Sequence, residues 1–139
     1  VKKLVTSGIP VMGHLGLTPQ SMHQLGGYRV QGRTDGDVIV EAAKALQAAG
    51  AFAIVLELVP AELAARITAE LTIPTIGIGA GVNCDAQVLV WTDLMGITKK
   101  APKLAKAYRN LRAEMLAATA EFAADVRSGQ FPTEAQTFN

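Results

Sequence analysis

Four apolar stretches of strand length are separated along the chain by amphipathic or polar segments. They are IPVMGHLGL at 9–17, FAIVLELV at 52–59, IPTIGIGAG at 73–81 and AQVLVWTDLMGI at 86–97. Their apolar residues run on continuously rather than alternating with polar ones, which is typical of strands in a parallel sheet with both faces covered. The pattern therefore predicts an α/β protein with four parallel strands.

Two segments between these strands have the periodicity of amphipathic helices. The segment 37–50 places four residues on one helical face before it stops at Gly50, where glycine accepts a positive φ: Val38, Ala42, Ala45 and Ala49. After the second strand, Pro60 suits the first turn of a helix, which has an apolar residue at every fourth position: Leu63, Ile67 and Leu71. Glu62 and Arg66 are spaced to pair on its surface.

The two ends of the chain also show helical patterns. The opening VKKLVTSGIP resembles the tail of a helix that closes at Gly8, so the sequence predicts that the chain starts within a fold. From Pro102 onward an apolar stripe continues to Gly129, through Leu104, Tyr108, Leu111, Met115, Ala118, Phe122 and Val126. This stripe predicts C-terminal helices from about residue 102, as one long helix or two with a break.

Length and composition limit the fold and the partners. The chain has 139 residues, half of them hydrophobic, which is enough for one core. Four strands with flanking helices form either a small open sheet or half of an eight-stranded barrel. In both, the active site lies at the carboxyl ends of the strands.

Charge and hydropathy exclude some classes of function. Thirteen Lys and Arg residues stand against twelve Asp and Glu, and only 5% of the residues are aromatic, so we expect no nucleic-acid partner. The apolar stretches are shorter than the roughly 20 residues that cross a bilayer, so we expect a cytoplasmic protein without a membrane partner. A single cysteine, Cys84, excludes an internal disulfide and is interpreted as a partly buried thiol.

Several polar residues fall at the predicted carboxyl ends of strands. Glu57 ends the apolar run FAIVLE, where burial of a carboxylate is costly unless something compensates it. It either reaches solvent or a neighbouring partner just past the strand, or it serves as a general base, because an apolar flank makes a carboxylate a better proton acceptor. His14, after IPVMG, is either a hydrogen-bonded structural residue or a contact for a substrate carboxylate or carbonyl.

The remaining candidates have weaker patterns. A dinucleotide-binding motif starting at Gly77 would need glycine at position 82, where the chain has Val82. The glycines of IGIGAG allow either close packing or close approach of a ligand. Asp85 and Asp93 lack the spaced acidic cluster of a metal site, so capping or solvated roles are favoured for both.

Five segments together are similar to one enzyme family. The segments GHLGLTPQS, GGYRVQGR, GAFAIVLELVPAELA, IPTIGIGAG and CDAQVLVWTD strongly resemble ketopantoate hydroxymethyltransferase, and they follow that family's order. The resemblance implies an eight-stranded (β/α) TIM barrel of the phosphoenolpyruvate mutase-like group, usually assembled as a homo-oligomer. It also implies transfer of a hydroxymethyl group from 5,10-methylenetetrahydrofolate to the keto acid 3-methyl-2-oxobutanoate, giving 2-dehydropantoate for pantothenate synthesis.

The resemblance also assigns roles to residues. Glu57 in VLELVP matches the family's proton acceptor, and His14 in GHLG lies in a block that lines its substrate pocket. In such enzymes Mg²⁺ chelates the keto acid. The family chain is about twice as long, consistent with the size of a barrel domain, so residues 1–139 are expected to be the C-terminal half of one barrel domain. The Mg²⁺ ligands are then expected in the missing N-terminal half. The alternative is a catalytically incomplete half-barrel that acts as an assembly module.

Overall fold

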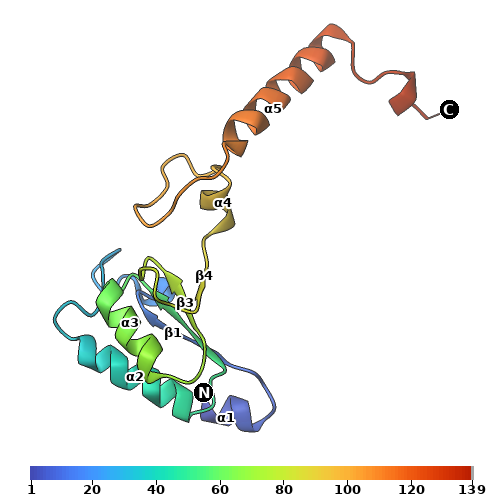
Figure 1. The fold of residues 1–139 in the computed structure, drawn as a ribbon. Helices are drawn as coiled ribbons and strands as arrows, with labels where there is room; N and C mark the ends of the chain where they lie inside the picture. Colours follow the sequence, from blue (N-terminus) through green and yellow to red (C-terminus); the bar gives the residue numbers. More distant parts are fainter. Residues whose placement is uncertain (139) are drawn as a thin grey trace. The chain divides into compact units, whose positions relative to one another are not determined.

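The computed structural model describes residues 1–138 and divides the chain into two compact units. The first unit is Val1–Val88 and the second begins at Leu89. Figure 1 traces the elements of both units in chain order. Within the described residues, no helix is long and apolar enough to cross a membrane.

The first unit is built on a parallel sheet. Its strands are β1 (Met12–Gly16), β2 (Ala53–Glu57), β3 (Thr75–Ile78) and β4 (Ala86–Gln87), and their spatial order is the same as their order along the chain. All three neighbouring pairs are parallel. The prediction of a mixed α/β protein with four parallel strands is confirmed. Because the strands are parallel, the carboxyl ends of β1, β2 and β3 lie at the same end of the sheet.

Helices α2 (Gly36–Ala48) and α3 (Ala61–Glu70) lie on the same face of this sheet (Figure 1). The predicted stripe of α3 is confirmed, because its apolar positions enter the core beneath the buried β2 residues Ile54 and Leu56. The predicted face of α2 is wrong: Val38 is 67% exposed, whereas Val40 and Ala43 are buried. Apolar residues surround much of α2, so the packing of the sheet, rather than the periodicity, selects the buried face.

The surface of α3 also differs from the sequence prediction. Arg66 pairs with Glu70, one turn further along, and with Asp37 at the start of α2, rather than with Glu62. The hydrogen bonds from Lys44 and then from Arg66 hold the pKa of Glu70 below its usual value. The long Arg66 side chain therefore connects α2 and α3, which a pattern within a single helix does not predict.

Strand β4 is much shorter than predicted. Only Ala86 and Gln87 pair with β3, and Trp91–Leu94 form the short helix α4 instead of continuing the strand. Short apolar runs do not distinguish a strand from a buried helical turn by periodicity. The link from β3 to β4 is also unusual, because parallel strands ordinarily need a crossover of about a dozen residues or more, and here residues 79–85 suffice without a helix.

The second unit contains α4, α5 (Leu111–Ser128) and the short 3₁₀ helix η2 (Glu134–Gln136). The prediction of helix from about residue 102 is wrong, since 101–110 are not helical. Hydrogen bonds from the Tyr108 and Leu111 N–H groups to the carbonyls of Leu94 and Met95 hold this segment against α4. Asn110 then caps α5 by accepting from the Ala113 N–H, and Gly129 ends it in the left-handed conformation, as predicted.

The remaining helices of the first unit are α1 (Lys2–Thr6), before Gly8, and the 3₁₀ helix η1 (Pro19–Ser21), after β1. Because successive strand residues point to opposite faces, the side chains between the buried positions lie on the face opposite α2 and α3. They are Met12, His14, Val55, Glu57, Ile76 and Ile78, and each is partly or largely exposed. This open face is mostly apolar and carries one histidine and one carboxylate.

Candidate active site

The ends of β1 and β2 bring the two principal candidates from the sequence into contact. In the parallel register His14 lies opposite Val55, and Glu57 lies opposite Gly16, so both side chains are on the open face. The Nε2 atom of His14 is 3.1 Å from Oε2 of Glu57. Their side chains are 32% and 13% exposed, respectively. Glu57 thus has a neighbouring partner while it remains accessible from the open face.

The chemistry of the two groups limits this hydrogen bond. An ionised carboxylate can only accept, so Nε2 of His14 must be the donor when Glu57 is charged. In the neutral imidazole, Nδ1 is then an acceptor, and it can donate to a substrate carboxylate only if the ring is doubly protonated. The arrangement orients one carboxylate oxygen of Glu57 and leaves the other oxygen for a further proton.

Gly16 allows the backbone of β1 to approach this carboxylate residue closely. It has a φ of +88°, and a Cβ atom built on it would lie 2.1 Å from the Glu57 carbonyl oxygen. The next residue, Leu17, donates its N–H to that same oxygen at 2.8 Å. A side chain at position 16 would therefore separate the two strand ends that hold His14 and Glu57 together.

The residue after Glu57 has an unfavourable backbone conformation. Leu58 has a φ of 48°, and it is the one non-glycine residue with a positive φ among those that the structure describes. For a side chain such as leucine, the left-handed region costs roughly 1–3 kcal/mol and is enriched at functional sites. The turn of the chain at the candidate base is therefore imposed by its surroundings.

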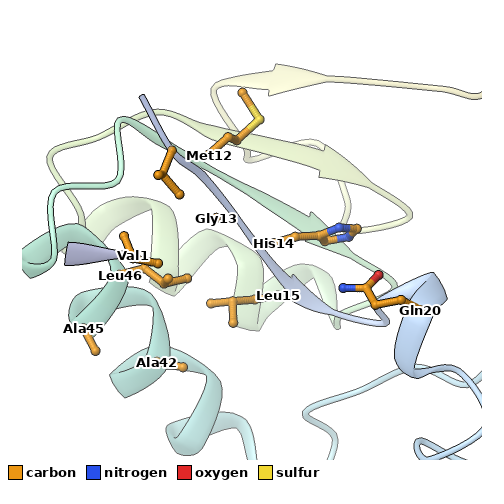
Figure 2. Close-up of a pocket in the computed structure, with 10 residues that line it drawn as sticks. Val1, Met12, Gly13, His14, Leu15, Gln20, Ala42, Ala45 and Leu46 are labelled. Carbon is orange, nitrogen blue, oxygen red and sulfur yellow. The ribbon is translucent and has the colours of Figure 1, made fainter. Parts of the chain in front are cut away.

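A pocket of about 530 Å³ lies along the free edge of β1 and beside α2. Figure 2 shows Met12 and His14 on one side of β1, with Leu15 and Leu46 on the side of α2. Gln20 of η1 lines the same pocket near His14, but it is not among the residues that the sequence predicts for the site. The sequence signal that could have indicated Gln20 is its position in the loop directly after β1. Glu57 does not line this pocket, which joins the candidate site only at the His14 end.

Two glycines, Gly77 within β3 and Gly81 after it, have packing roles. A Cβ atom at Gly81 would lie 2.5 Å from that of Ala61, and one at Gly77 would lie 3.0 Å from the Cys84 sulfur. Of the two interpretations left open by the sequence, close packing therefore accounts for both positions. Cys84 is partly buried against the core, as expected for it.

Asp85 stabilises the short β3–β4 connection. One of its oxygens, Oδ2, accepts from the Thr75 N–H at 2.8 Å and from the Thr75 hydroxyl at 3.1 Å. These backbone and side-chain hydrogen bonds hold the pKa of Asp85 below its usual value of 3.8. Asp85 thus accepts from the first residue of β3 and does not cap a helix. Asp93 lies buried in the first turn of α4, so the solvated role expected for it is wrong.

Comparison with known proteins identifies relatives along almost the entire chain. A family model described as ketopantoate hydroxymethyltransferase matches residues 1–134. Proteins named 3-methyl-2-oxobutanoate hydroxymethyltransferase are 60% identical in Acidothermus cellulolyticus, 59% in Acaryochloris marina and 55% in Pelobacter propionicus. The matches cover 99%, 95% and 100% of this chain and 52% of each relative. The chain spans about half the length of the curated relatives it matches.

Proposed function

The chain belongs to the ketopantoate hydroxymethyltransferase family, and on that premise we propose that it carries the proton-accepting part of a hydroxymethyltransferase active site. The substrate is 3-methyl-2-oxobutanoate, and 5,10-methylenetetrahydrofolate is the one-carbon donor. The observation that carries the proposal is the contact between His14 and Glu57 at adjoining strand ends. The product, 2-dehydropantoate, serves pantothenate synthesis.

In this proposal Glu57 is the catalytic base. Its carboxylate accepts the proton from C3 of the keto acid, and the C–H electron pair becomes the enolate. The enolate carbon then forms a bond to the folate-borne methylene carbon, whose two C–N bonds break while water supplies the hydroxyl oxygen. The two nitrogens of the released tetrahydrofolate take up the proton removed from C3 and one proton of the water. His14 orients Glu57 through Nε2, and its ring also contacts the bound keto acid in this proposal. The low exposure of Glu57 keeps water from competing for the carboxylate.

The open face of the sheet supports the proposed barrel. Parallel sheets are ordinarily covered on both faces, whereas here helices α2 and α3 lie on one face and the mostly apolar open face lies on the other (Figure 1). We propose that residues 1–139 form the C-terminal half of an eight-stranded (β/α) barrel, with this face toward its interior. Strands β1 and β4, at the two edges of the sheet, would each pair with a further strand. We also propose that the protein at its natural length is a homo-oligomer located in the cytoplasm.

The described residues do not form a complete metal site. The described residues contain no group of three His, Cys, Asp or Glu side chains positioned to hold a metal ion. A complete Mg²⁺ site therefore does not fit within them, and no step above passes through the metal. We propose that the ligands of the Mg²⁺ lie in the part of the relatives' length that this chain does not span.

The test is hydroxymethyl transfer by the protein at its natural length, with both substrates and Mg²⁺ supplied. We expect Glu57→Gln to lower the rate roughly 100- to 10,000-fold, the usual range for removal of a general base. Glu62→Gln is the matched control, because Glu62 is an exposed glutamate in the first turn of α3. Unchanged turnover in Glu57→Gln would refute the assignment of the base.

A second candidate function is an assembly module that lacks catalysis of its own. The uncovered face and the two edge strands favour it, because both demand a partner. Light scattering on the 139-residue chain tests the module. Association of this chain into a defined oligomer supports it, and a stable, monodisperse monomer contradicts it.

A further inference from the structure

We propose that Leu58 is a positioning residue, whose left-handed backbone aims the Glu57 carboxylate at the proton to be removed. This inference rests on the proposed function and adds a determinant that the sequence pattern does not show. Leu58 follows Glu57 directly, and its φ of 48° turns the chain at the end of β2. It acts through Glu57 and has no contact with substrate in this proposal.

The direction of the chain around Leu58 supports this role. Strict alternation from the buried Leu56 would send residue 58 toward the helices and residue 59 toward the open face. Instead Val59 is 2% exposed and belongs to the core, while Leu58 is only partly buried. The left-handed turn thus reverses the alternation immediately after Glu57, so that Glu57 is the last side chain of β2 on the open face.

The backbone hydrogen bonds of Leu58 explain how the unfavourable conformation persists. Its N–H donates to the Ile78 carbonyl at the end of β3, at 3.0 Å. Its own carbonyl accepts from the N–H of Gln31, in the long loop before α2, at 2.8 Å. One residue therefore connects β2 to the end of β3 and to this loop.

The third strand end is connected through Glu57 itself. The Glu57 carbonyl accepts from the Leu17 N–H just past β1, and the carboxylate meets His14. With both the carbonyl of Glu57 and the two polar backbone groups of Leu58 held, the backbone on either side of the base has little freedom. A residue that resists the left-handed region would shift the carboxylate relative to His14.

The test compares two replacements of Leu58 in the protein at its natural length. Asparagine tolerates the left-handed region, whereas valine, being β-branched, resists it. The readout is the exchange of the C3 proton of 3-methyl-2-oxobutanoate with deuterium from the solvent, followed by NMR. In this exchange Glu57 removes the C3 proton, the enolate forms, and a deuteron returns to the same carbon.

We expect Leu58→Val to lower the exchange rate on the order of 10- to 100-fold, as misplacement of a catalytic group does. The KM for the keto acid should stay within about twofold, because Leu58 acts on positioning rather than on binding. Leu58→Asn should keep the rate of deuterium exchange within about threefold of that of the unsubstituted protein, because asparagine tolerates the left-handed region. Leu104→Val is the matched control, since Leu104 is a partly buried leucine of the second unit without a positive φ.

The outcomes separate this inference from the proposed function. If the unsubstituted protein exchanges the proton and L58V exchanges it equally fast, this inference alone is overturned. If the unsubstituted protein shows no exchange, the proposed function is overturned, and this inference with it. If L58V does not fold, the test passes to L58N and Leu58→Ala, and an alanine variant as active as the asparagine one overturns the inference.

Discussion

Two carboxylates lie at opposite ends of the central strands of the first unit, and they are held in different ways. Glu57 is at the carboxyl end of β2, and Asp85 is beside Thr75 at the start of β3. Asp85 receives two hydrogen bonds from Thr75, one of them from the backbone, and Thr75 in turn contacts the Thr68 hydroxyl at 2.8 Å. The carboxylate of Glu57 has a single side-chain partner, the titratable His14. Asp85 accepts a backbone and a hydroxyl hydrogen bond from Thr75 and so stabilises a connection, whereas Glu57 contacts only a titratable side chain on the open face.

The surroundings of these two carboxylates follow the same division. Thr75 is fully buried and belongs to a hydrogen-bonded group without strained backbone. Glu57 is followed directly by Leu58, a non-glycine residue in the left-handed region. Strain of this kind persists only where the neighbouring structure enforces it, and it gathers at functional sites. The kind of hydrogen-bond partner and the strain of the adjoining backbone therefore distinguish Asp85 from the proposed base Glu57.

The largest expected contrast comes from removing the charge of each carboxylate separately. Glu57→Gln should lower deuterium exchange into the keto acid roughly 100- to 10,000-fold and leave the urea midpoint of unfolding nearly unchanged. Asp85→Asn should lower the urea midpoint, because an uncharged amide oxygen accepts the two Thr75 hydrogen bonds more weakly than a carboxylate does, and should leave the exchange rate nearly unchanged in the folded protein. The opposite assignment of the two effects would contradict the comparison.

Gly16→Ala should disturb the end of β1 through two separate causes. A Cβ atom at position 16 would lie 2.1 Å from the Glu57 carbonyl oxygen and 2.8 Å from Val59 Cγ1, and the residue has a φ of +88°. We expect a loss of roughly 1–3 kcal/mol in the free energy of unfolding. We also expect slower exchange of the C3 proton of the keto acid with deuterium. Gly8→Ala is the matched control, because Gly8 has a φ of +81° and nothing within 4 Å of its Cβ position. Equal losses in both variants would show that the close approach is unimportant.

His14→Gln distinguishes the two roles that the histidine has in the proposal. If its main contribution is to orient Glu57, kcat should fall on the order of 10-fold while the KM for the keto acid changes little. If contact with the keto acid dominates, the KM should rise and kcat should change little. Steady-state kinetics with the keto acid varied at saturating folate measures both quantities.

The smallest expected effect is the pH dependence contributed by Asp85. Because Thr75 holds the pKa of Asp85 below 3.8, the ionised form is favoured in the folded protein. Its stabilising contribution is therefore complete above pH 3.8 and is lost as the pH falls through the lower folded value. Urea unfolding of the unsubstituted protein and Asp85→Asn should differ most above pH 3.8 and converge below it. A constant difference across this range would contradict the role given to Thr75.

Much of the local structure could be predicted from the sequence because it depends on neighbouring residues. The continuous apolar runs around Ile54 and Ile76 indicated strands, and the spacing of Leu63 and Ile67 indicated the buried stripe of α3. Gly129 marked the end of α5 because glycine adopts the left-handed region readily. The start of α5 was missed, since the contacts of 101–110 with α4, rather than their apolar periodicity, decide their conformation.

The candidate site divides between sequence and structure in the same way. By itself the sequence determined the candidate residues, Glu57 and His14, each placed near a strand end, within motifs that relate the chain to its family. Only the tertiary structure decided that His14 Nε2 lies 3.1 Å from Glu57 Oε2. The two residues are 43 positions apart in the chain, and the register between β1 and β2 brings them together. The turn at Leu58 was likewise beyond local prediction, since leucine avoids that conformation unless distant partners such as Ile78 and Gln31 hold it there.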